Sequence, residues 1–546
     1  MVQTYIVQRG WQLVSVFFFL WLPQLGLAQS NIATKYWVCF KDKHQTRFDP
    51  LAYFDFKAIA RRQREGLSLM DSTDFPVNES YIAAIQAEAS QYVGESRWLN
   101  ASICYLSSQA AKRVKDLPFV SSIAPVGELP LAPCLHAVSG YDEKLLTAQT
   151  DILQYPLFAA QQLDGKNITI AIFDAGFKGT TNNPQLQHLI DHKQIKATYN
   201  FVTDRNFVFD YHSHGTMVLS CIAGQEKNTP LGCATGANFL LARTEQTTSE
   251  SKIEEDNWVR SLEWADKNGA DIVNSSLGYT HQLYLRNEMT GHTHLMAKAA
   301  NTAFAKGILI VNSAGNEGQS WWEIVAGPAD SDSILTVGGI DPKSGIHHPQ
   351  SSYGPNASGV LKPNVSAFFS AIVAVGQKMQ TADGTSFSAP LVTGFAACVW
   401  QLHPEWTVQQ VFHEIQKSGH LYPYFDYAHG YGVPQASHFF EPAKEAEKQF
   451  DLVFHAQDSS YHFQLCEPVS NMRHFESEAQ DTLRNFVYYH LCDEQGNMTV
   501  YHVLIPQEFH GAELEQSDCD DCLIRAHYRG QTIETTRKKI RQTPQK

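Results

Sequence analysis

Between residues 168 and 338, short apolar runs alternate with longer segments of helical periodicity, and this alternation restricts the fold more than any other feature. The runs expected to form strands are residues 168–173, 238–242, 270–274, 307–312 and 334–338. The segments expected to form helices are residues 213–223, 253–267 and 295–306. Such alternation predicts a parallel sheet with helices on both faces, because each parallel connection must cross over the sheet. We therefore predict an α/β domain.

Polar residues stand at or just after the ends of three predicted strands. Asp174 closes the first run, Ser276 follows the run 270–274, and Asn316 follows the run 307–312. The carboxyl ends of parallel strands meet at one edge of the sheet, where open α/β sheets place their sites. These three side chains are therefore expected to lie close together.

The stretch 384–390 (GTSFSAP) places Ser386 in a turn of small residues ahead of an apolar run with helical spacing. At a helix N-terminus, unpaired N–H groups and the positive dipole end favour a developing negative charge. A helix N-cap is the simpler interpretation of an isolated serine. A nucleophile is preferred because His214, at the start of a predicted helix, and Asp174 supply its partners. An aspartate orients an imidazole, and the imidazole takes the serine proton.

Five segments, in order, resemble the signatures of the subtilisin-like serine peptidases, the subtilases. They are residues 174–176 (DAG), 214–216 (HGT), 274–278 (NSSLG), 313–318 (SAGNEG) and 384–390. The resemblance implies Asp174, His214 and Ser386 as a catalytic triad, in the chain order of subtilisin, and Asn316 as the oxyanion-hole side chain. The residues that it implies for substrate binding are Ser276, Leu277, Gly278 and Gly315. It implies a subtilisin-like sheet and no metal ligand.

Catalysis by such a triad requires no cofactor, and two segments depart from the family pattern. Residues 225–231 stand where many subtilases have a longer calcium loop; they are few and include Pro230, so structural calcium is possible but not expected. Asn364 stands where aspartate is commoner, which affects packing more than chemistry. The family has a substrate-binding rim near residues 243–258, but we expect most carboxylates there to form a solvated first helical turn that suits the helix dipole.

The first 28 residues have the features of a secretory signal peptide. Arg9 precedes an apolar run at residues 11–22, and Ala28 precedes a polar residue. The run is short for a membrane span, which needs ~20 residues. The product is therefore expected to be secreted or held in the cell envelope, with no membrane attachment after cleavage.

Residues 29–128 are expected to form a small α+β domain, with strands at 36–40, 98–105 and 120–124 and helices at 51–65 and 108–117. Its position is similar to that of subtilase propeptides, which implies an intramolecular inhibitor that is removed on maturation. A permanent N-terminal domain is the alternative. Residues 129–134 are proline-rich and form the predicted linker for cleavage, with the mature N-terminus before residue 153.

Residues 129–447 are assigned to the catalytic domain, which the glycine-rich turn at 430–436 closes. Residues 448–546 are assigned to a β-rich domain with a basic tail. A hairpin is predicted from strands at 486–492 and 498–504 joined by a turn at 493–497, with a further strand at 523–528. The basic tail at 537–541 is expected to be disordered.

Cysteine pairing is expected in an oxidising compartment. Cys221 and Cys233 flank a short loop and are candidates for a pair, whereas Cys398 is expected to lie in the core. The cysteines of the β-rich domain are Cys466, Cys492, Cys519 and Cys522. Disulfides, with three pairings open, are favoured over a zinc site, because only one close cysteine pair is present.

The net charge of −14, with no long basic stretch before the tail, argues against nucleic acid as a partner. The sequence predicts a secreted serine endopeptidase, made as a zymogen, that hydrolyses polypeptides through an acyl-enzyme. One alternative is a catalytically inactive subtilase scaffold for binding or adhesion; another is an acyl transferase or peptide ligase using the same site. An α/β-hydrolase esterase fits poorly, because the G-x-S-x-G turn is missing and the triad order differs.

Overall fold

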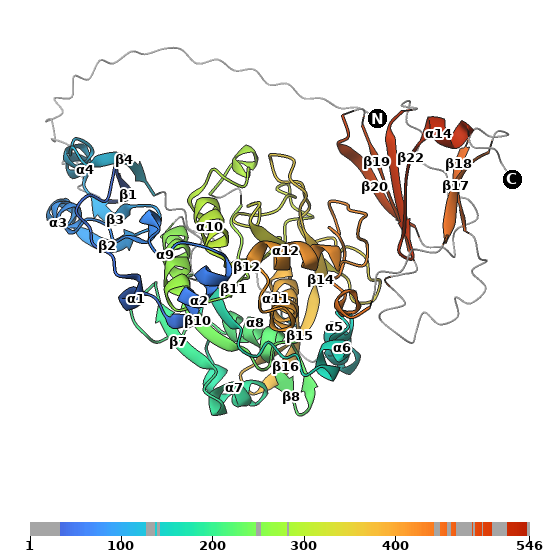
Figure 1. Ribbon diagram of the computed structural model, residues 1–546, viewed down its shortest axis with the longest axis horizontal. Helices are drawn as coiled ribbons and strands as arrows, with labels where there is room; N and C mark the ends of the chain where they lie inside the picture. The colour runs from blue at the N-terminus through green and yellow to red at the C-terminus, as the bar shows by residue number, and fades with distance from the viewer. Residues whose placement is uncertain are drawn as a thin grey trace, which may run out of the picture.

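The computed structural model describes residues 33–126, 137–138, 142–246, 253–280, 283–441, 448–455, 460–465, 483, 486–493, 495–504 and 521–542. The predicted signal peptide and the linker at 129–134 lie outside this set. Figure 1 shows an N-terminal domain, a central domain and a C-terminal β-rich part in chain order. Within the described residues, no helix is both long enough and apolar enough to cross a membrane.

The central domain is built on a seven-stranded sheet with the order β14-β13-β12-β11-β6-β10-β7. Its strands are β6 (Thr169–Asp174), β7 (Ile195–Asn200), β10 (Asn238–Arg243), β11 (Ile272–Ser275), β12 (Leu309–Ser313), β13 (Ile334–Ile340) and β14 (Val365–Phe368). All neighbouring strands pair in parallel. The five strands predicted from apolar runs are all present, whereas β7 and β14 were not predicted.

Helices cover both faces of this sheet, as predicted. They are α8 (His214–Ala223), α9 (Ile253–Lys267), α10 (Leu295–Ala305) and α11 (Thr385–Leu402). Successive residues of β6 point to opposite faces. Ile170 and Ile172 share one apolar core with α8 and α11, and Ala171 and Phe173 share the other with α9 and α10. Buried apolar residues on both faces explain why β6 reads as a continuous apolar run.

Shorter elements surround the sheet. The helices are α5 (Glu143–Asp151), α6 (Tyr155–Ala160), α7 (Gln187–Asp191) and α12 (Val408–Lys417). A three-stranded antiparallel sheet has the order β15-β16-β5, from β15 (Ser370–Val375), β16 (Lys378–Asp383) and β5 (Ala137–Val138). The segment in place of a calcium loop forms a two-stranded hairpin, β8 (Gln225–Glu226) and β9 (Thr229–Pro230).

The N-terminal domain is an antiparallel sheet with helices on one face. Its strands are β1 (Thr34–Phe40), β2 (Gln91–Ser96), β3 (Ala101–Leu106) and β4 (Val120–Pro125), in the order β2-β3-β1-β4. Its helices are α1 (Pro50–Tyr53), α2 (Phe56–Arg64), α3 (Glu79–Glu88) and α4 (Ser108–Lys115). Val38 and Cys104 face α3 and α4, and their neighbours Trp37 and Ile103 join the core beside α9. The sheet is therefore buried between its own helices and the central domain.

The single helix predicted at 51–65 is wrong. Phe54 has an extended conformation (φ −88°, ψ 144°) and ends α1. Asp55 then caps α2, because its side chain accepts a hydrogen bond from the backbone N–H of Lys57. The element α3 and the strand β2 were not predicted either.

The C-terminal part is β-rich, as predicted. A four-stranded sheet has the order β20-β19-β21-β22, from β19 (Val487–Cys492), β20 (Met498–Leu504), β21 (Leu523–Tyr528) and β22 (Gln531–Thr536). The strands β17 (Phe450–His455) and β18 (Ser460–Leu465) form a separate hairpin. The tail predicted to be disordered instead forms α14 (Arg537–Gln542), in which Ile540 is buried in the core of this part.

The predicted pairing of Cys221 with Cys233 is wrong, because both are free thiols. Both are buried in the core between α8 and α11, where the Cys398 thiol donates a hydrogen bond to the Cys233 carbonyl oxygen at 3.2 Å. Cys492 is also a free thiol, so the four C-terminal cysteines do not all pair. Cys466 and Cys519 lie outside the described residues.

Candidate active site

Asp174 is the last residue of β6 and lies at the carboxyl edge of the sheet, as the sequence pattern predicts. Its side chain is 1% exposed, and its Oδ1 accepts a hydrogen bond from the backbone N–H of Ala175 at 2.8 Å. Both carboxylate oxygens lie 2.9 Å from His214 Nδ1. This contact fixes the orientation of the imidazole and assigns its proton to Nδ1.

His214 is the first residue of α8, and its side chain is 13% exposed. Close packing fixes the start of this helix: a Cβ on Gly215 would lie 2.6 Å from the Gly176 carbonyl oxygen, so only glycine fits there. Burial lowers the pKa of His214, but the negative charge of Asp174 and its hydrogen bond outweigh burial, so the pKa is raised above its usual value. The imidazole is therefore held as a proton acceptor of increased basicity.

Ser386 is the second residue of α11, so its backbone N–H has no partner within the helix. The hydroxyl group donates to the Ser276 carbonyl oxygen at 3.2 Å. In return, the Ser276 hydroxyl donates to the Ser386 carbonyl oxygen at 2.9 Å. The His214 ring centre lies 5.6 Å from that of Phe387, the residue after Ser386. The serine is therefore fixed by two hydrogen bonds to Ser276, and it lines the same cavity as the His214 imidazole.

Asn316 lies beside the start of α11. Its Oδ1 accepts hydrogen bonds from the Thr385 backbone N–H at 2.9 Å and from the Thr385 hydroxyl at 3.0 Å. A Cβ built on Gly384, whose φ is +138°, would lie 3.5 Å from Asn316 Nδ2 and 3.7 Å from its Oδ1, so the amide group packs against the turn before Ser386. Asn316 also lines the same cavity as Ser386, so its Nδ2 is the candidate oxyanion donor.

One cavity of about 440 Å³ brings the predicted residues together. Its lining includes His214, Ser386, Asn316, Ser276, Leu277, Gly278 and Gly315. Asp174 does not line it, since it lies buried behind His214. The strand end at residues 276–278 lies along this cavity, as expected for a segment that pairs with an extended peptide.

Several lining residues were not among the predicted site residues: His212, Glu317 and Gln350, and also Glu245 and Glu254, which fall in the rim near residues 243–258 that the resemblance indicated. The expectation that the acidic first turn of α9 is solvated is wrong for its described members. Glu254, Glu255 and Asp256 are 2%, 4% and 0% exposed. Glu254 accepts hydrogen bonds from Gln246 N–H at 2.8 Å and from the Tyr279 hydroxyl at 3.1 Å. The signal that could have found this turn is the substrate-binding rim that the family resemblance places near residues 243–258.

The two tryptophans after Gly318 do not line the cavity. Trp322 is buried in the core beside α9 and α10, and Trp321 is 66% exposed. His212 accepts a hydrogen bond through Nδ1 from the His214 backbone N–H at 3.2 Å, so it supports the start of α8. Asn364 accepts a hydrogen bond from Thr336 N–H at 2.8 Å, which agrees with a packing role.

Comparisons with known proteins agree with this geometry. Residues 165–432 match the subtilase family model, and residues 35–133 match the peptidase S8 propeptide domain of Bacteroidota. Subtilisin E of Bacillus subtilis (strain 168) is 28% identical over 326 residues, which cover 59% of this chain and 76% of that protein. Alkaline elastase YaB of Bacillus sp. (strain YaB) is 25% identical over 299 residues, covering 54% of this chain and 71% of that protein.

Among solved structures, MycP1 from Mycobacterium smegmatis aligns with a TM-score of 0.45 and 22% identity, covering 59% of this chain and 91% of that chain. The two family models cover the central and N-terminal domains described above. The chain is therefore a member of the subtilase family of serine-type endopeptidases, with a propeptide domain ahead of its catalytic domain.

Proposed function

We propose that this chain is a secreted serine endopeptidase that hydrolyses peptide bonds through Asp174, His214 and Ser386 and an acyl-enzyme intermediate. The observation that carries the proposal is the contact of both Asp174 oxygens with His214 Nδ1 at 2.9 Å, beside a serine at a helix N-terminus. The same cavity is lined by His214, Ser386 and Asn316. These groups supply a base, a nucleophile and an oxyanion donor within one site.

Acylation begins when the Ser386 hydroxyl turns from the Ser276 carbonyl oxygen toward His214 Nε2. The oxygen attacks the substrate carbonyl carbon while Nε2 takes the hydroxyl proton. Asp174 stabilises the imidazolium that forms, because its charge lies against Nδ1. The tetrahedral intermediate collapses, the C–N bond breaks, and Nε2 returns a proton to the leaving amine.

Deacylation repeats these steps with water as the nucleophile. His214 takes a proton from the water and returns it to Ser386 as the ester bond breaks. In both halves the negative oxygen is stabilised by Asn316 Nδ2 and the Ser386 backbone N–H, because both residues line the cavity that takes the substrate. The side chains carry every proton transfer, so the proposed chemistry needs no cofactor. Structural calcium at residues 225–231 is not expected, for the reason given from the sequence.

The segment that directly follows β11 lines one wall of the cavity, which suits an extended polypeptide substrate. Residues Ser276–Gly278 offer backbone groups for strand pairing, and Gly315 is the proposed further contact.

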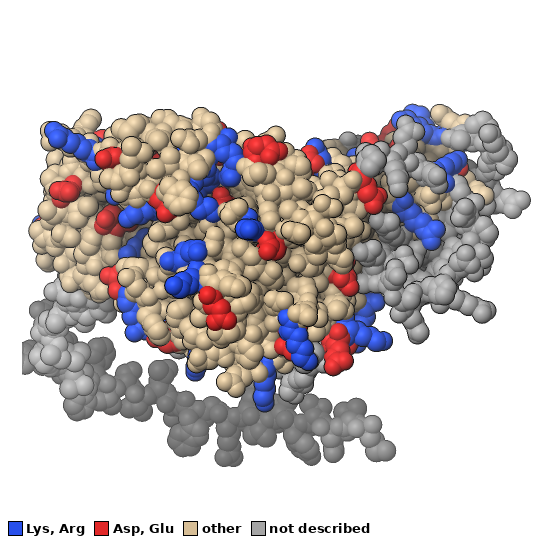
Figure 2. Space-filling model, turned by 60° about the horizontal axis from the view of Figure 1, so that its bottom comes forward, with Lys and Arg blue, Asp and Glu red and all other residues tan. Residues whose placement is uncertain are grey.

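On the face in Figure 2, lysine and arginine side chains are interspersed with aspartate and glutamate, with no continuous basic area to suggest a nucleic acid partner. The proposal also includes a signal peptide that ends at residue 28 and directs secretion, an N-terminal domain that ends at 128 and a catalytic domain that ends at 447. Disulfide bonding is proposed for the C-terminal domain.

A fluorophosphonate probe tests the function directly. The secreted protein and its Ser386→Ala variant are incubated with the probe and compared on a gel. We expect a labelled band in the wild type that is shorter than the full chain, and no label in the variant. A variant that also stays longer than the wild type would show that maturation is self-catalysed.

The competing function is an inactive subtilase scaffold. No label on folded, processed wild type would refute the peptidase proposal and favour the scaffold. Product analysis with a peptide substrate and an added amine separates hydrolysis from acyl transfer, because a transferase yields the amide in excess of the acid.

A further inference from the structure

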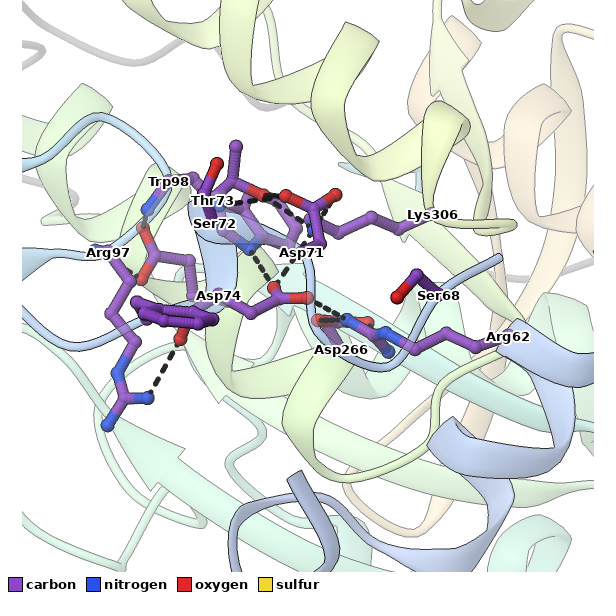
Figure 3. A network of polar contacts seen from close by, with 12 residues as sticks. Arg62, Ser68, Asp71, Ser72, Thr73, Asp74, Arg97, Trp98, Asp266 and Lys306 are labelled. Atoms are coloured by element: carbon purple, nitrogen blue, oxygen red, sulfur yellow. Dashed lines mark hydrogen bonds and ion pairs between the residues drawn. The ribbon is translucent and has the colours of Figure 1, made fainter. Parts of the chain in front are cut away.

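The two domains that flank the catalytic domain contact it through different kinds of side chain. The N-terminal domain uses paired charges, such as Arg62 with Asp266 at 2.7 Å and Asp74 with Lys306 at 2.9 Å (Figure 3). The four-stranded C-terminal sheet instead uses tyrosine and histidine rings. Such rings bury large surfaces, and they carry no full charge while the histidines are neutral. The C-terminal contact is therefore held by burial of ring surface.

Both faces of the C-terminal sheet are covered, because all six residues of its strand β19 are buried. Val487, Tyr489 and Leu491 point into the core of the C-terminal part. Successive residues of a strand point to opposite faces, so Tyr488 and His490 point away from this core. Another part of the molecule must cover that second face.

The second face meets the catalytic domain. We call Tyr488, His490 and His527 the docking face; His527 on β21 pairs directly with Tyr488. Residues 420–431 of the catalytic domain cover it, with the buried Tyr424 at the centre. The Tyr424 ring centre lies 5.1 Å from that of His490 and 6.1 Å from those of Tyr488 and His527. Burial lowers the pKa of both histidines to about 4, so both rings are neutral at neutral pH.

The covering segment carries a buried aspartate–histidine pair. Asp426 Oδ1 lies 3.0 Å from His429 Nδ1, and the Tyr424 hydroxyl donates to Asp426 Oδ2 at 3.3 Å. The His429 ring centre lies 5.3 Å from that of Tyr488 on the docking face. His429 Nε2 accepts a hydrogen bond from the His347 backbone N–H at 2.8 Å, so its proton is on Nδ1. His429 therefore links the docking face to the segment that begins at His347.

That segment, residues 347–353, is here called the bridge loop. His347 Nε2 lies 3.0 Å from the Ser351 carbonyl oxygen, so the imidazole joins the start of the loop to a point near its end. The His347 and Tyr353 ring centres are 4.3 Å apart. The Tyr353 ring centre lies 6.3 Å from that of Tyr501 on β20, within the range of aromatic pairs. The bridge loop therefore also contacts the C-terminal sheet directly.

The bridge loop holds the backbone on both sides of Asn316. Before Asn316, the Gly315 carbonyl oxygen accepts a hydrogen bond from the Ser352 N–H at 3.0 Å. After it, the Glu317 N–H donates to the Ser352 hydroxyl oxygen at 3.0 Å. Because one serine makes both bonds, a shift of the bridge loop moves the backbone that carries the candidate oxyanion donor.

We propose that docking of the C-terminal sheet positions Asn316 for catalysis, with His429 and the bridge loop as the connection. The effect on the rate rests on the proposed peptidase function, whereas the connection itself does not. His429 is a positioning residue, because it acts on Asn316 through the bridge loop. Removal of the sheet exposes the Asp426–His429 pair to water, which competes for its hydrogen bonds and weakens them.

The first test undocks the sheet. His527→Asp places a carboxylate on the docking face, where the imidazole is hydrogen-bonded to the His420 backbone, and a buried charge without a partner is costly. The matched control is His413→Asp, because His413 is exposed on α12. Each full-length variant is purified after maturation, titrated with fluorophosphonate and assayed with a chromogenic peptide.

The expected result separates kcat from KM. A small displacement of a catalytic group can cost up to about 10²-fold, so we expect His527→Asp to lower kcat roughly tenfold or more. The KM should stay within about twofold, because the oxyanion donor acts in the transition state. The His413→Asp control should match the wild type. A kcat for His527→Asp equal to that of the control overturns the proposal, and so does a loss confined to KM.

The second test changes the connection at His429. His429→Leu removes both contacts of the imidazole, whereas His429→Gln keeps an amide oxygen that can accept from the His347 N–H. We expect kcat to fall for the leucine variant and to stay within about threefold of the wild type for the glutamine variant. A glutamine variant as impaired as the leucine variant would refute the positioning role of this residue.

Hydrogen exchange tests the connection without the reaction. The full chain with Ser386→Ala is compared with and without His527→Asp, so failure of the peptidase proposal would not affect the result. The amides of His347, Ser352 and Glu317 donate the hydrogen bonds of the connection. We expect these three to exchange faster in the His527→Asp chain, with β6 unchanged. Unchanged exchange at all three overturns the proposal, and equally faster exchange in β6 would mean general destabilisation and would overturn it too.

Discussion

Replacing Asn316 by alanine tests the proposed oxyanion hole. Asn316 lines the same cavity as Ser386, and its amide group contacts Thr385, the residue before Ser386. The proposed donors are Asn316 Nδ2 and the Ser386 backbone N–H, and alanine removes the first and leaves the second. In subtilisin, a relative, loss of such a donor costs about 2.7–4 kcal/mol, or roughly 10²–10³-fold in kcat. We expect that range here, with little change in KM, because the charge develops only in the transition state.

The Asn316 side chain has a second task that needs its own control. Its Oδ1 accepts hydrogen bonds from the Thr385 N–H and hydroxyl, so alanine also loosens the start of α11. Thr385→Ser is the control, because it keeps both hydroxyl hydrogen bonds, to Asn316 Oδ1 and from the Gly315 N–H, and keeps the Asn316 donor. This control is expected to lower kcat by less than about tenfold, the equivalent of one net hydrogen bond of about 1 kcal/mol.

The assay measures kcat and KM of the matured enzymes with a chromogenic peptide, normalised to active sites titrated with fluorophosphonate. A kcat for Asn316→Ala within tenfold of the wild type would refute the oxyanion role. A loss that appears only in KM would refute it as well, since it would place the side chain in ground-state binding.

Three further predictions concern pH and stability. Asp174 raises the pKa of His214 against the effect of burial, so kcat/KM should fall with decreasing pH from a point above the ordinary histidine pKa of ~6.5. Asp174→Asn should move this fall to lower pH and reduce kcat by roughly 10⁴-fold. A profile of kcat/KM against pH measures the position of the fall. Burial raises the pKa of Glu263 to about 7, so the folded chain takes up a proton that the unfolded chain, with an ordinary glutamate, does not. The contribution of Glu263 to the free energy of unfolding should therefore fall as pH rises toward 7 and stay constant above it; Glu263→Gln should abolish this dependence in urea unfolding curves measured between pH 5 and 8. Phe395 is fully buried in α11, so Phe395→Ala should lower stability by about 3–5 kcal/mol, seen as a lower midpoint of thermal unfolding, and an unchanged midpoint would mean that the core closes around the gap.

The central sheet and the positions of Asp174, Ser276 and Asn316 were predictable from sequence. Buried parallel strands must be apolar on both faces, so they appear as continuous runs with turn residues at their ends. Side chains that follow such runs meet at one edge, whatever the connecting segments do. The pattern within each run was sufficient to predict its strand, because burial on both faces requires apolar residues within that run itself.

The surroundings of the carboxylates on α9 were not predictable in this way. Glu255 and Asp256 read as a solvated first turn, yet their partners are Tyr284, Lys35 and Trp37. Lys35 and Trp37 lie about two hundred residues away in sequence and in another domain. The spacing of apolar and charged residues within α9 gives no indication of a partner in another domain. The same reason explains α14, whose basic sequence is ordered by burial of one isoleucine.

The error at Cys221 and Cys233 has a different physical origin. Proximity in sequence across a short loop does not by itself predict a disulfide, because its geometry depends on the direction of the two side chains. Cys221 faces the core from α8, and burial raises the pKa of both thiols well above the usual range. Buried, protonated thiols of this kind act as small apolar side chains.

The charge distribution on α9 also bears on why the catalytic domain has a domain ahead of it. Asp256, Glu263 and Asp266 are spaced seven and three residues apart, so they fall on one face of the helix. The N-terminal domain meets all three: Lys35 at the first, the backbone N–H groups of residues 97 and 98 at the second, and two arginines at the third. Without that domain Asp256 and Asp266 lose their cationic partners Lys35, Arg61 and Arg62. The sheet of the catalytic domain packs on α9, so a partner that neutralises this face stabilises the helix as the sheet assembles. Neutralisation of this face of α9 is therefore one stabilising contribution of the N-terminal domain to the catalytic domain.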